Sequence, residues 1–140
     1  MLNSLGRGRF VAYSAGSQPA VQVNAYALKT LERMHIPTDG YRSKDWDEFA
    51  RSGAPAMDFV FTLCDKAAGG VCPVWPGQPM TAHWGVPDPA AIQGTDEEKA
   101  KAFWDCAVTL KRRIELMLAL PLASLDRLAI QRQIEDIGLR

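Results

Sequence analysis

Two cysteines lie close together in the sequence, Cys64 and Cys72, with seven residues between them that include Gly69 and Gly70. A disulfide requires two Cα atoms within about 7 Å of each other. A flexible segment of this length can bring its ends that close and can also hold them apart, as a switchable redox pair must. The spacing is not a standard signature of a zinc or thioredoxin site, and a cysteine is often simply a small core residue. Spacing alone therefore leaves a redox pair and two core residues as equal alternatives.

A loop that could present a carboxyl group covers residues 84–89 (Trp-Gly-Val-Pro-Asp-Pro). Asp88 stands between two prolines, which restrict its backbone and hold its side chain in one direction. A carboxyl group held in this way can act as a general acid if its surroundings keep it protonated. The dipeptide alone favours an ordinary Asp-Pro turn. His83 is interpreted as a loop residue, and Cys106 as a core residue on a helix.

The segment that must position Cys64 is a predicted strand over residues 57–63, whose nearly continuous apolar run is typical of a parallel strand covered on both faces. Residues 10–14 alternate and are rich in β-favouring side chains, so a second strand is predicted there. In open α/β sheets, functional residues gather at the carboxyl ends of strands. Cys64 directly follows such an end, which is where a functional residue is expected.

The helices of the chain are predicted from apolar spacing and capping residues. They are expected over residues 2–5, after Asn24, over residues 43–51, after a capping box at residues 95–98, and over a last amphipathic segment. The apolar positions of that last helix are Leu125, Leu128, Ile134 and Ile137. The fourth helix carries an apolar stripe that ends before Pro121: Phe103, Ala107, Leu110, Ile114 and Met117. Residues 64–94 are rich in glycine and proline and are predicted to be mostly loop. Together these elements predict an α/β domain with a parallel sheet flanked by helices.

The amino-acid composition argues against several classes of protein. The 16 Lys and Arg residues balance the 16 Asp and Glu residues, and this zero net charge argues against nucleic-acid binding. No apolar run approaches the roughly 20 residues of a membrane helix, and the first residues do not resemble a signal peptide. Three cysteines are too few, and odd in number, for a disulfide framework. We therefore expect a cytoplasmic protein.

Four segments, taken in order, resemble a known family. They are residues 13–16 (Tyr-Ser-Ala-Gly), 62–65 (Thr-Leu-Cys-Asp), 72–73 (Cys-Pro) and 83–90 (His-Trp-Gly-Val-Pro-Asp-Pro-Ala). They are similar to those of thioredoxin-coupled arsenate reductases of the low-molecular-weight tyrosine phosphatase fold. The resemblance covers residues 1–120 as one domain, and residues 121–140 resemble a C-terminal helical extension. Phosphatases of this fold share the Asp-Pro loop but lack the paired redox cysteines.

The resemblance implies a three-layer fold, a reaction and a set of site residues. In the family's scheme, a cysteine in a Cys-x5-Arg phosphate loop attacks arsenate, and the equivalent of Asp88 protonates a leaving oxygen. Cys64 then attacks the arsenylated cysteine and releases arsenite, and Cys72 takes over the disulfide. A thioredoxin-like protein reduces that disulfide, so the scheme needs no metal or organic cofactor.

This sequence departs from the family at the phosphate loop. Its one Cys-x5-Arg spacing joins Cys106 to Arg112, inside a predicted helix without glycine. Backbone N–H groups bonded within a helix cannot cradle an anion, so we reject this pair as a phosphate loop. We expect Met1 to be an internal methionine, with the first central strand and the phosphate loop missing. Such a chain would be inactive alone and could self-associate through exposed strand edges. A phosphatase of small phosphoesters and a non-catalytic redox or binding module are the alternatives.

Overall fold

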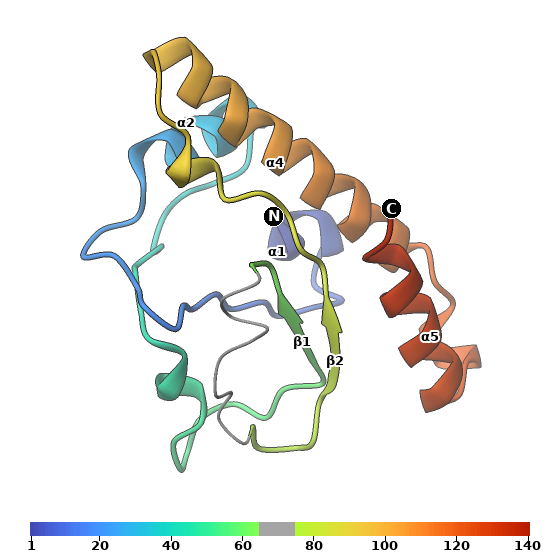
Figure 1. Cartoon of the computed structure of the whole chain (residues 1–140). Helices are drawn as coiled ribbons and strands as arrows, with labels where there is room; N and C mark the ends of the chain where they lie inside the picture. Colours follow the sequence, from blue (N-terminus) through green and yellow to red (C-terminus); the bar gives the residue numbers. More distant parts are fainter. Residues whose placement is uncertain (65–74) are drawn as a thin grey trace. The chain divides into compact units, whose positions relative to one another are not determined.

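The computed structural model describes residues 1–64 and 75–140 (Figure 1). These residues form two compact units. The helical unit consists of Met1–Tyr13, Ala20–Ser43 and Val86–Leu118. The sheet unit consists of Ser14–Pro19, Lys44–Gly85 and Ala119–Arg140. Residues from distant parts of the sequence therefore meet within each unit. The predicted division at residue 120 stays a prediction, although residues from Ala119 onward do cluster with the sheet.

Helix α4 (Asp96–Leu118) is the longest helix of the helical unit, and the other elements of that unit pack on it. These other elements are α1 (Leu2–Gly6), α2 (Ala25–Arg33) and the 3-10 helix η2 (Pro89–Ala91). Ala107 and Met117 of the predicted apolar stripe are buried, with Met117 only 1% exposed. The predicted amphipathic helix is therefore confirmed.

The predicted caps are present at the start of both longer helices of this unit. The Asn24 side chain accepts a hydrogen bond from the Tyr26 backbone N–H at 2.8 Å. The Thr95 hydroxyl accepts one from the Glu98 N–H at 3.2 Å, and three acidic residues occupy the first turn of α4. Each cap satisfies a backbone donor that the helix itself leaves unpaired. The acidic side chains stabilise α4 because they lie at the positive end of the helix dipole.

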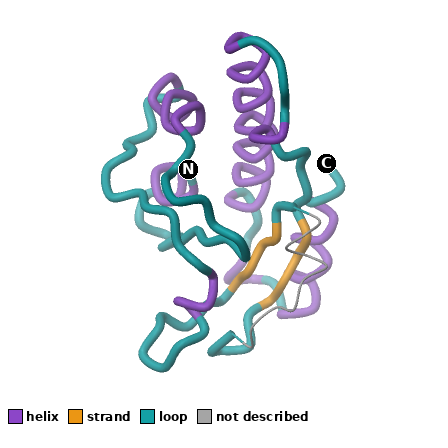
Figure 2. Tube along the Cα trace, turned by 60° about the vertical axis from the view of Figure 1, so that its left-hand side comes forward, coloured by secondary structure: helices purple, strands orange, loops and turns teal. Residues whose placement is uncertain are grey.

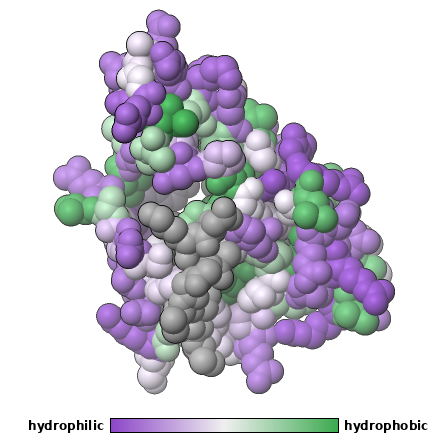
Figure 3. All heavy atoms as spheres, in the orientation of Figure 1, coloured by the Kyte–Doolittle hydropathy of each residue, from purple (hydrophilic) through white to green (hydrophobic). Residues whose placement is uncertain are grey.

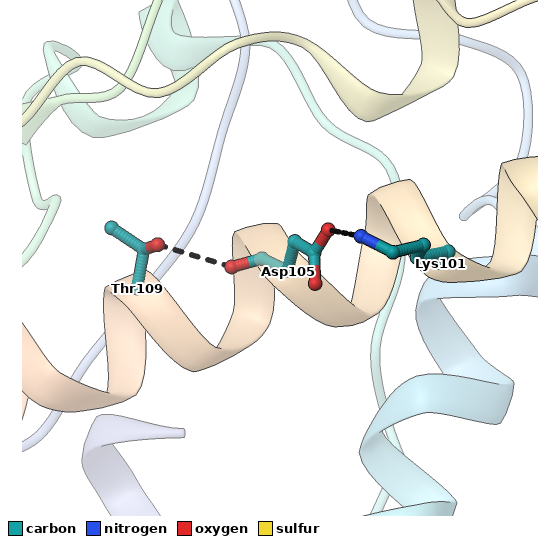
Figure 4. Close-up of polar contacts among 3 residues, drawn as sticks. All are labelled: Lys101, Asp105 and Thr109. Atoms are coloured by element: carbon teal, nitrogen blue, oxygen red, sulfur yellow. Dashed lines mark hydrogen bonds and ion pairs between the residues drawn. The ribbon is translucent and has the colours of Figure 1, made fainter.

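One exposed stretch of α4 is held by contacts between successive turns (Figure 4). Lys101 Nζ lies 2.6 Å from Asp105 Oδ2, and the Thr109 hydroxyl donates to the Asp105 carbonyl at 3.0 Å. Residues four apart face each other on a helix surface, and such pairs add a few tenths of a kcal/mol. They support the helix locally, and the buried opposite side fixes it in the unit.

The described part of the sheet unit contains two parallel strands, β1 (Phe59–Thr62) and β2 (Met80–His83), which lie side by side in Figure 2. Phe59 pairs with Met80 and Thr62 with His83, so the carboxyl ends of the two strands lie side by side. The helical elements among the described residues of this unit are η1 (Trp46–Phe49), η3 (Leu122–Ser124) and α5 (Arg127–Ile137). The α/β class and the parallel pairing are confirmed.

Helix α5 packs on β2 through an isoleucine face. The Asp126 side chain caps it by accepting from the Ala129 N–H at 2.7 Å. Ile130, Ile134 and Ile137 are buried, and Ile134 is fully so. The sequence predicted Leu128 on this buried face as well, but 60% of Leu128 is exposed. The helix was predicted correctly, and its buried face begins two residues later than the leucine spacing indicated.

The predicted strand over residues 10–14 is wrong, because these residues form no regular structure. Val11 is 75% exposed and Tyr13 51% exposed. The Asn3 side-chain amide bonds both backbone groups of Ala12, accepting from its N–H at 2.8 Å and donating to its carbonyl at 3.0 Å. Local alternation shows only that a segment could join a sheet, and here a side chain takes the bonds that a neighbouring strand would make.

Apolar residues on the surface are scattered, as Figure 3 shows for the face in view. The most exposed of them are Val21 at 97% and Leu139 at 88%. Single exposed apolar residues are normal for a folded domain. Among the described residues, no helix is both long enough and apolar enough to span a membrane.

Candidate active site

Cys64 lies just beyond the carboxyl end of β1, as the sequence predicted. The strand ends at Thr62, Cys64 follows two residues later in a bend, and its side chain belongs to the exposed class. A thiol in this position can meet a reactant or another protein without rearrangement of the strand. Cys72 lies outside the described residues, as do Gly69 and Gly70, so the relay between the two cysteines stays a prediction.

The two strand ends beside Cys64 are joined by a side-chain hydrogen bond. Thr62 Oγ1 lies 2.8 Å from His83 Nδ1, across the last pair of the sheet. His83 is therefore the final residue of β2, and its interpretation as a loop residue is wrong. A Cβ added at Gly85 would lie 2.6 Å from His83 Nε2, so only glycine leaves room for the imidazole here. The ring is held between Thr62 and the Gly85 backbone.

Asp88 lies in the helical unit, where it caps the short helix η2. Its Oδ1 accepts a hydrogen bond from the Ala90 N–H at 2.9 Å, and its backbone is extended. The residue is exposed, and η2 packs on α4. The two flanking prolines and this cap hold the carboxyl group in one direction, as expected from the sequence. The ordinary Asp-Pro turn is thus present too, and the role of Asp88 as a general acid stays a prediction.

Within the helical unit, Asp88 acts electrostatically on a thiol of α4. Burial raises the pKa of Cys106, the charge of Asp88 raises it further, and Arg113 opposes them by lowering it. Arg113 is only 7% exposed, and burial lowers its own pKa, as does the neighbouring Arg112. Sequence reasoning missed Arg113 as a buried charge, because it belongs to a run of three cations, residues 111–113, and such runs on a helix are usually solvated. A thiol with a raised pKa is a poor nucleophile at neutral pH, which fits the interpretation of Cys106 as a core residue.

Replacing Asp88 is expected to make Cys106 more acidic. In Asp88→Asn the negative charge that disfavours the thiolate is gone, so the pKa of Cys106 falls and its alkylation at a given pH below that pKa becomes faster. The measurement is the rate of Cys106 alkylation against pH, read from its peptide by mass spectrometry. Asp105→Asn is the matched control, since Asp105 is adjacent in sequence but pairs with Lys101. Equal shifts in both variants would contradict the assigned interaction.

The rejected Cys-x5-Arg pair lies where the sequence placed it. Cys106 and Arg112 both lie within α4, which is helical from Asp96 to Leu118. The backbone N–H groups between them are bonded along the helix and are not available to an oxyanion. Among the described residues, no group of three or more metal-ligating side chains could hold a metal ion.

A surface hollow of about 340 Å³ lies on the helical unit, and neither Cys64 nor Asp88 is among its lining residues. Its lining residues come from the end of α2 and from α4: Met34, Trp104, Val108, Lys111, Arg112 and Glu115. Lys111 lies 3.5 Å from Glu115, and the Arg33 guanidinium lies 4.3 Å from the centre of the Trp104 ring. Lys111 is therefore paired with a carboxylate of the chain itself, and no cysteine, serine or histidine is among the described lining residues.

Three relatives of the chain are named arsenate reductase. A protein named arsenate reductase from Halalkalibacterium halodurans is 38% identical over 103 residues, which cover 74% of this chain and 70% of that protein. One from Oceanobacillus iheyensis is 36% identical over 104 residues, 74% of this chain and 71% of that protein. One from Bacillus subtilis is 39% identical over 87 residues, 62% of this chain and 59% of that protein.

The family itself follows from a match over most of the chain. The family model described as low molecular weight phosphotyrosine protein phosphatase matches residues 1–130. The match includes β1, β2, the residues 83–90 that contain Asp88, and all of α4. It agrees with the resemblance drawn from the four short segments, which is confirmed. The chain therefore belongs to the low molecular weight phosphotyrosine protein phosphatase family.

Proposed function

We propose that this chain serves the reduction of arsenate to arsenite, with Cys64 and Cys72 as a thiol–disulfide relay and Asp88 as general acid. The observation that carries the proposal is the position of Cys64, exposed just beyond the carboxyl end of a parallel strand. Its support from the comparisons is that the matched relatives are named arsenate reductase. Arsenate is then the substrate, and a thioredoxin-like dithiol in the cytoplasm is the reductant.

The relay balances as a two-electron transfer. A cysteine that has attacked arsenate holds arsenic(V) through a sulfur–arsenic bond, after Asp88 has given a proton to the departing oxygen. The Cys64 thiolate attacks that sulfur, so a disulfide forms and the electron pair of the broken bond leaves with arsenic as arsenite. Cys72 then attacks Cys64 and releases the first thiolate. The dithiol reductant supplies two electrons to the Cys64–Cys72 disulfide and is itself oxidised.

The first nucleophile of this scheme has no candidate in the sequence outside α4. The one Cys-x5-Arg spacing is helical, and burial and Asp88 raise the pKa of its cysteine. The proposal therefore assigns to this chain the proton transfer by Asp88 and the later, disulfide-forming steps. It leaves the attack on arsenate to a Cys-x5-Arg loop that this sequence does not contain.

Hydrolysis of a small phosphoester is the second candidate, because the family model carries the name of a phosphatase. Such a reaction uses a phosphate-loop cysteine and an aspartic acid and leaves Cys64 and Cys72 without a chemical role. The two functions therefore differ in whether the cysteine pair is needed, and that difference can be measured directly.

Mild oxidation is expected to join Cys64 to Cys72. Exposure of Cys64 and the short glycine-containing segment between the two cysteines favour this pairing over one with the half-buried Cys106. Peptide mass spectrometry should show the 64–72 linkage, and reduced thioredoxin should remove it. Cys106→Ser should leave the linkage intact, and Cys72→Ser should prevent it. Preferred pairing of Cys64 with Cys106 would contradict the relay.

A further inference from the structure

Helix α5 lies along the edge of β2 that faces away from β1 (Figure 1). The Met80 N–H donates to the Asp58 carbonyl at 2.9 Å, and the Trp84 N–H donates to the Thr62 carbonyl at 2.8 Å. Alternate residues of a parallel strand direct their backbone groups to opposite edges. The carbonyl groups of Thr81 and His83 therefore point to the outer edge, where a further strand would pair.

Side chains of α5 already bond backbone acceptors along this edge. Gln131 Nε2 donates to the Thr81 carbonyl at 2.7 Å. Arg127 Nη2 donates to the Gln78 carbonyl at 2.6 Å, just before the strand begins. Residues 127 and 131 of α5 thus contact residues 78 and 81 in the same order along the chain. The side chains of α5 donate hydrogen bonds to this edge of β2, where a neighbouring strand would donate its backbone N–H groups.

The end of α5 approaches the end of β2 too closely for any side chain at residue 138. A Cβ added at Gly138 would lie 2.5 Å from the His83 carbonyl oxygen and 2.9 Å from Trp84 Cδ1. The Trp84 indole N–H donates to the Ile134 carbonyl at 2.9 Å. Trp84 is only 3% exposed, and Ile134 is fully buried. The indole is therefore fixed to the helix by both packing and a buried hydrogen bond.

The same indole packs on β1. The rings of Phe61 and Trp84 have centroids 4.1 Å apart, and Phe61 is the third of the four residues of β1. Contacts thus run from α5 through Trp84 to the strand that leads to Cys64. A two-stranded sheet is marginal by itself, so order at this strand end depends on what packs against it.

We propose that α5 is a clamp on the outer edge of β2 and that Trp84 is a positioning residue for the strand end that presents Cys64. By occupying acceptors of this edge, the helix prevents another strand or chain from pairing there. By holding Trp84, it keeps Phe61 and the end of β1 in place. This role goes beyond the proposed function and does not depend on which reaction Cys64 performs.

Hydrogen exchange of the full chain, followed by mass spectrometry, tests the clamp. Gln131→Met keeps the length of the side chain and removes the donor to the Thr81 carbonyl and to Glu135 Oε1 of the same helix, whereas Gln131→Lys keeps a donor for both. Exchange in β1 and β2 is expected to become about three- to tenfold faster in Gln131→Met, the usual effect of one lost hydrogen bond, and to return towards the wild-type rate in Gln131→Lys. Gln133→Met, at an exposed position of the same helix, is the matched control and should leave exchange unchanged.

A second variant tests the step through the indole. Trp84→Phe removes the donor to Ile134 and keeps an aromatic ring, and exchange of residues 59–64 should rise by a similar factor while α4 stays at the wild-type rate. Equal acceleration in α4 and in the strands would overturn the proposal, because α5 would then support only overall stability. Unchanged exchange in both Gln131→Met and Trp84→Phe would overturn it as well. No arsenate or reductant is added, so these results are independent of the proposed reaction.

Discussion

Residues 1–140 alone are expected to show no arsenate-dependent oxidation of a thioredoxin-like dithiol. The reaction begins with a thiolate whose oxyanion substrate is held by backbone N–H groups and an arginine. In this chain the one matching spacing, Cys106 to Arg112, is part of α4. Burial and Asp88 also raise the pKa of Cys106 and disfavour its thiolate. Removing a covalent nucleophile typically lowers turnover by on the order of 10⁴- to 10⁶-fold, so the assay should read background.

The assay follows arsenite formation together with oxidation of the dithiol, and it needs a protein that can turn over. A form with a strand and a Cys-x5-Arg loop placed ahead of Leu2 should reduce arsenate. In that form Cys64→Ser should abolish turnover, and Cys106→Ser should preserve it. Arsenate reduction by residues 1–140 that disappears in Cys106→Ser would show that the helical pair acts as the nucleophile, against our assignment.

Truncating Ile134 to alanine is expected to lower the free energy of unfolding by about 2–5 kcal/mol, the usual cost of emptying a fully buried aliphatic site. Ile134 has 0% exposure at the centre of the buried face of α5. The loss is large because a domain is typically stable by only about 5–15 kcal/mol. Because the sheet described here has only two strands, its order depends strongly on the helix that covers it.

Urea unfolding followed by tryptophan fluorescence measures this change. Leu128→Ala provides the matched control on the same helix, because Leu128 is 60% exposed and its truncation should change stability by no more than about 0.5 kcal/mol. Equal losses in the two variants would mean that the sequence-based register of α5, with Leu128 buried, is correct and the observed register is not. A near-wild-type midpoint for Ile134→Ala would mean that α5 adds little to the fold.

Features that depend on a few neighbouring residues were predictable from the sequence. Asn24 and Thr95 cap helices where they were expected to, since each cap involves a side chain and an N–H two or three residues away. The strand before Cys64 was predicted from its own apolar run, and it ends one residue earlier than expected, at Thr62. The place of Cys64 beyond a strand end followed from that strand. These features do not depend on contacts with distant parts of the chain.

Features that depend on distant partners were decided by the tertiary structure. Residues 10–14 have the pattern of a strand, yet Asn3 takes the backbone bonds of Ala12. Strand pairing requires a neighbour, and the alternation of one segment does not identify that neighbour. For the same reason the local sequence predicts that His83 is a loop residue, whereas its pairing with Thr62 makes it the last residue of β2.

Short sequence segments were enough to predict the family, the parallel-strand class and the residues on which chemistry is expected, Cys64, Cys72 and Asp88. These predictions rest on residue types and spacings within short segments, so they do not require knowledge of how the segments pack together. Only the tertiary structure revealed that Arg113 is buried and that Gln131 and Trp84 tie α5 to β2. The residues joined by these two bonds are about fifty positions apart in the sequence. Burial and edge contacts of this kind come from packing between distant segments, and no local pattern encodes them.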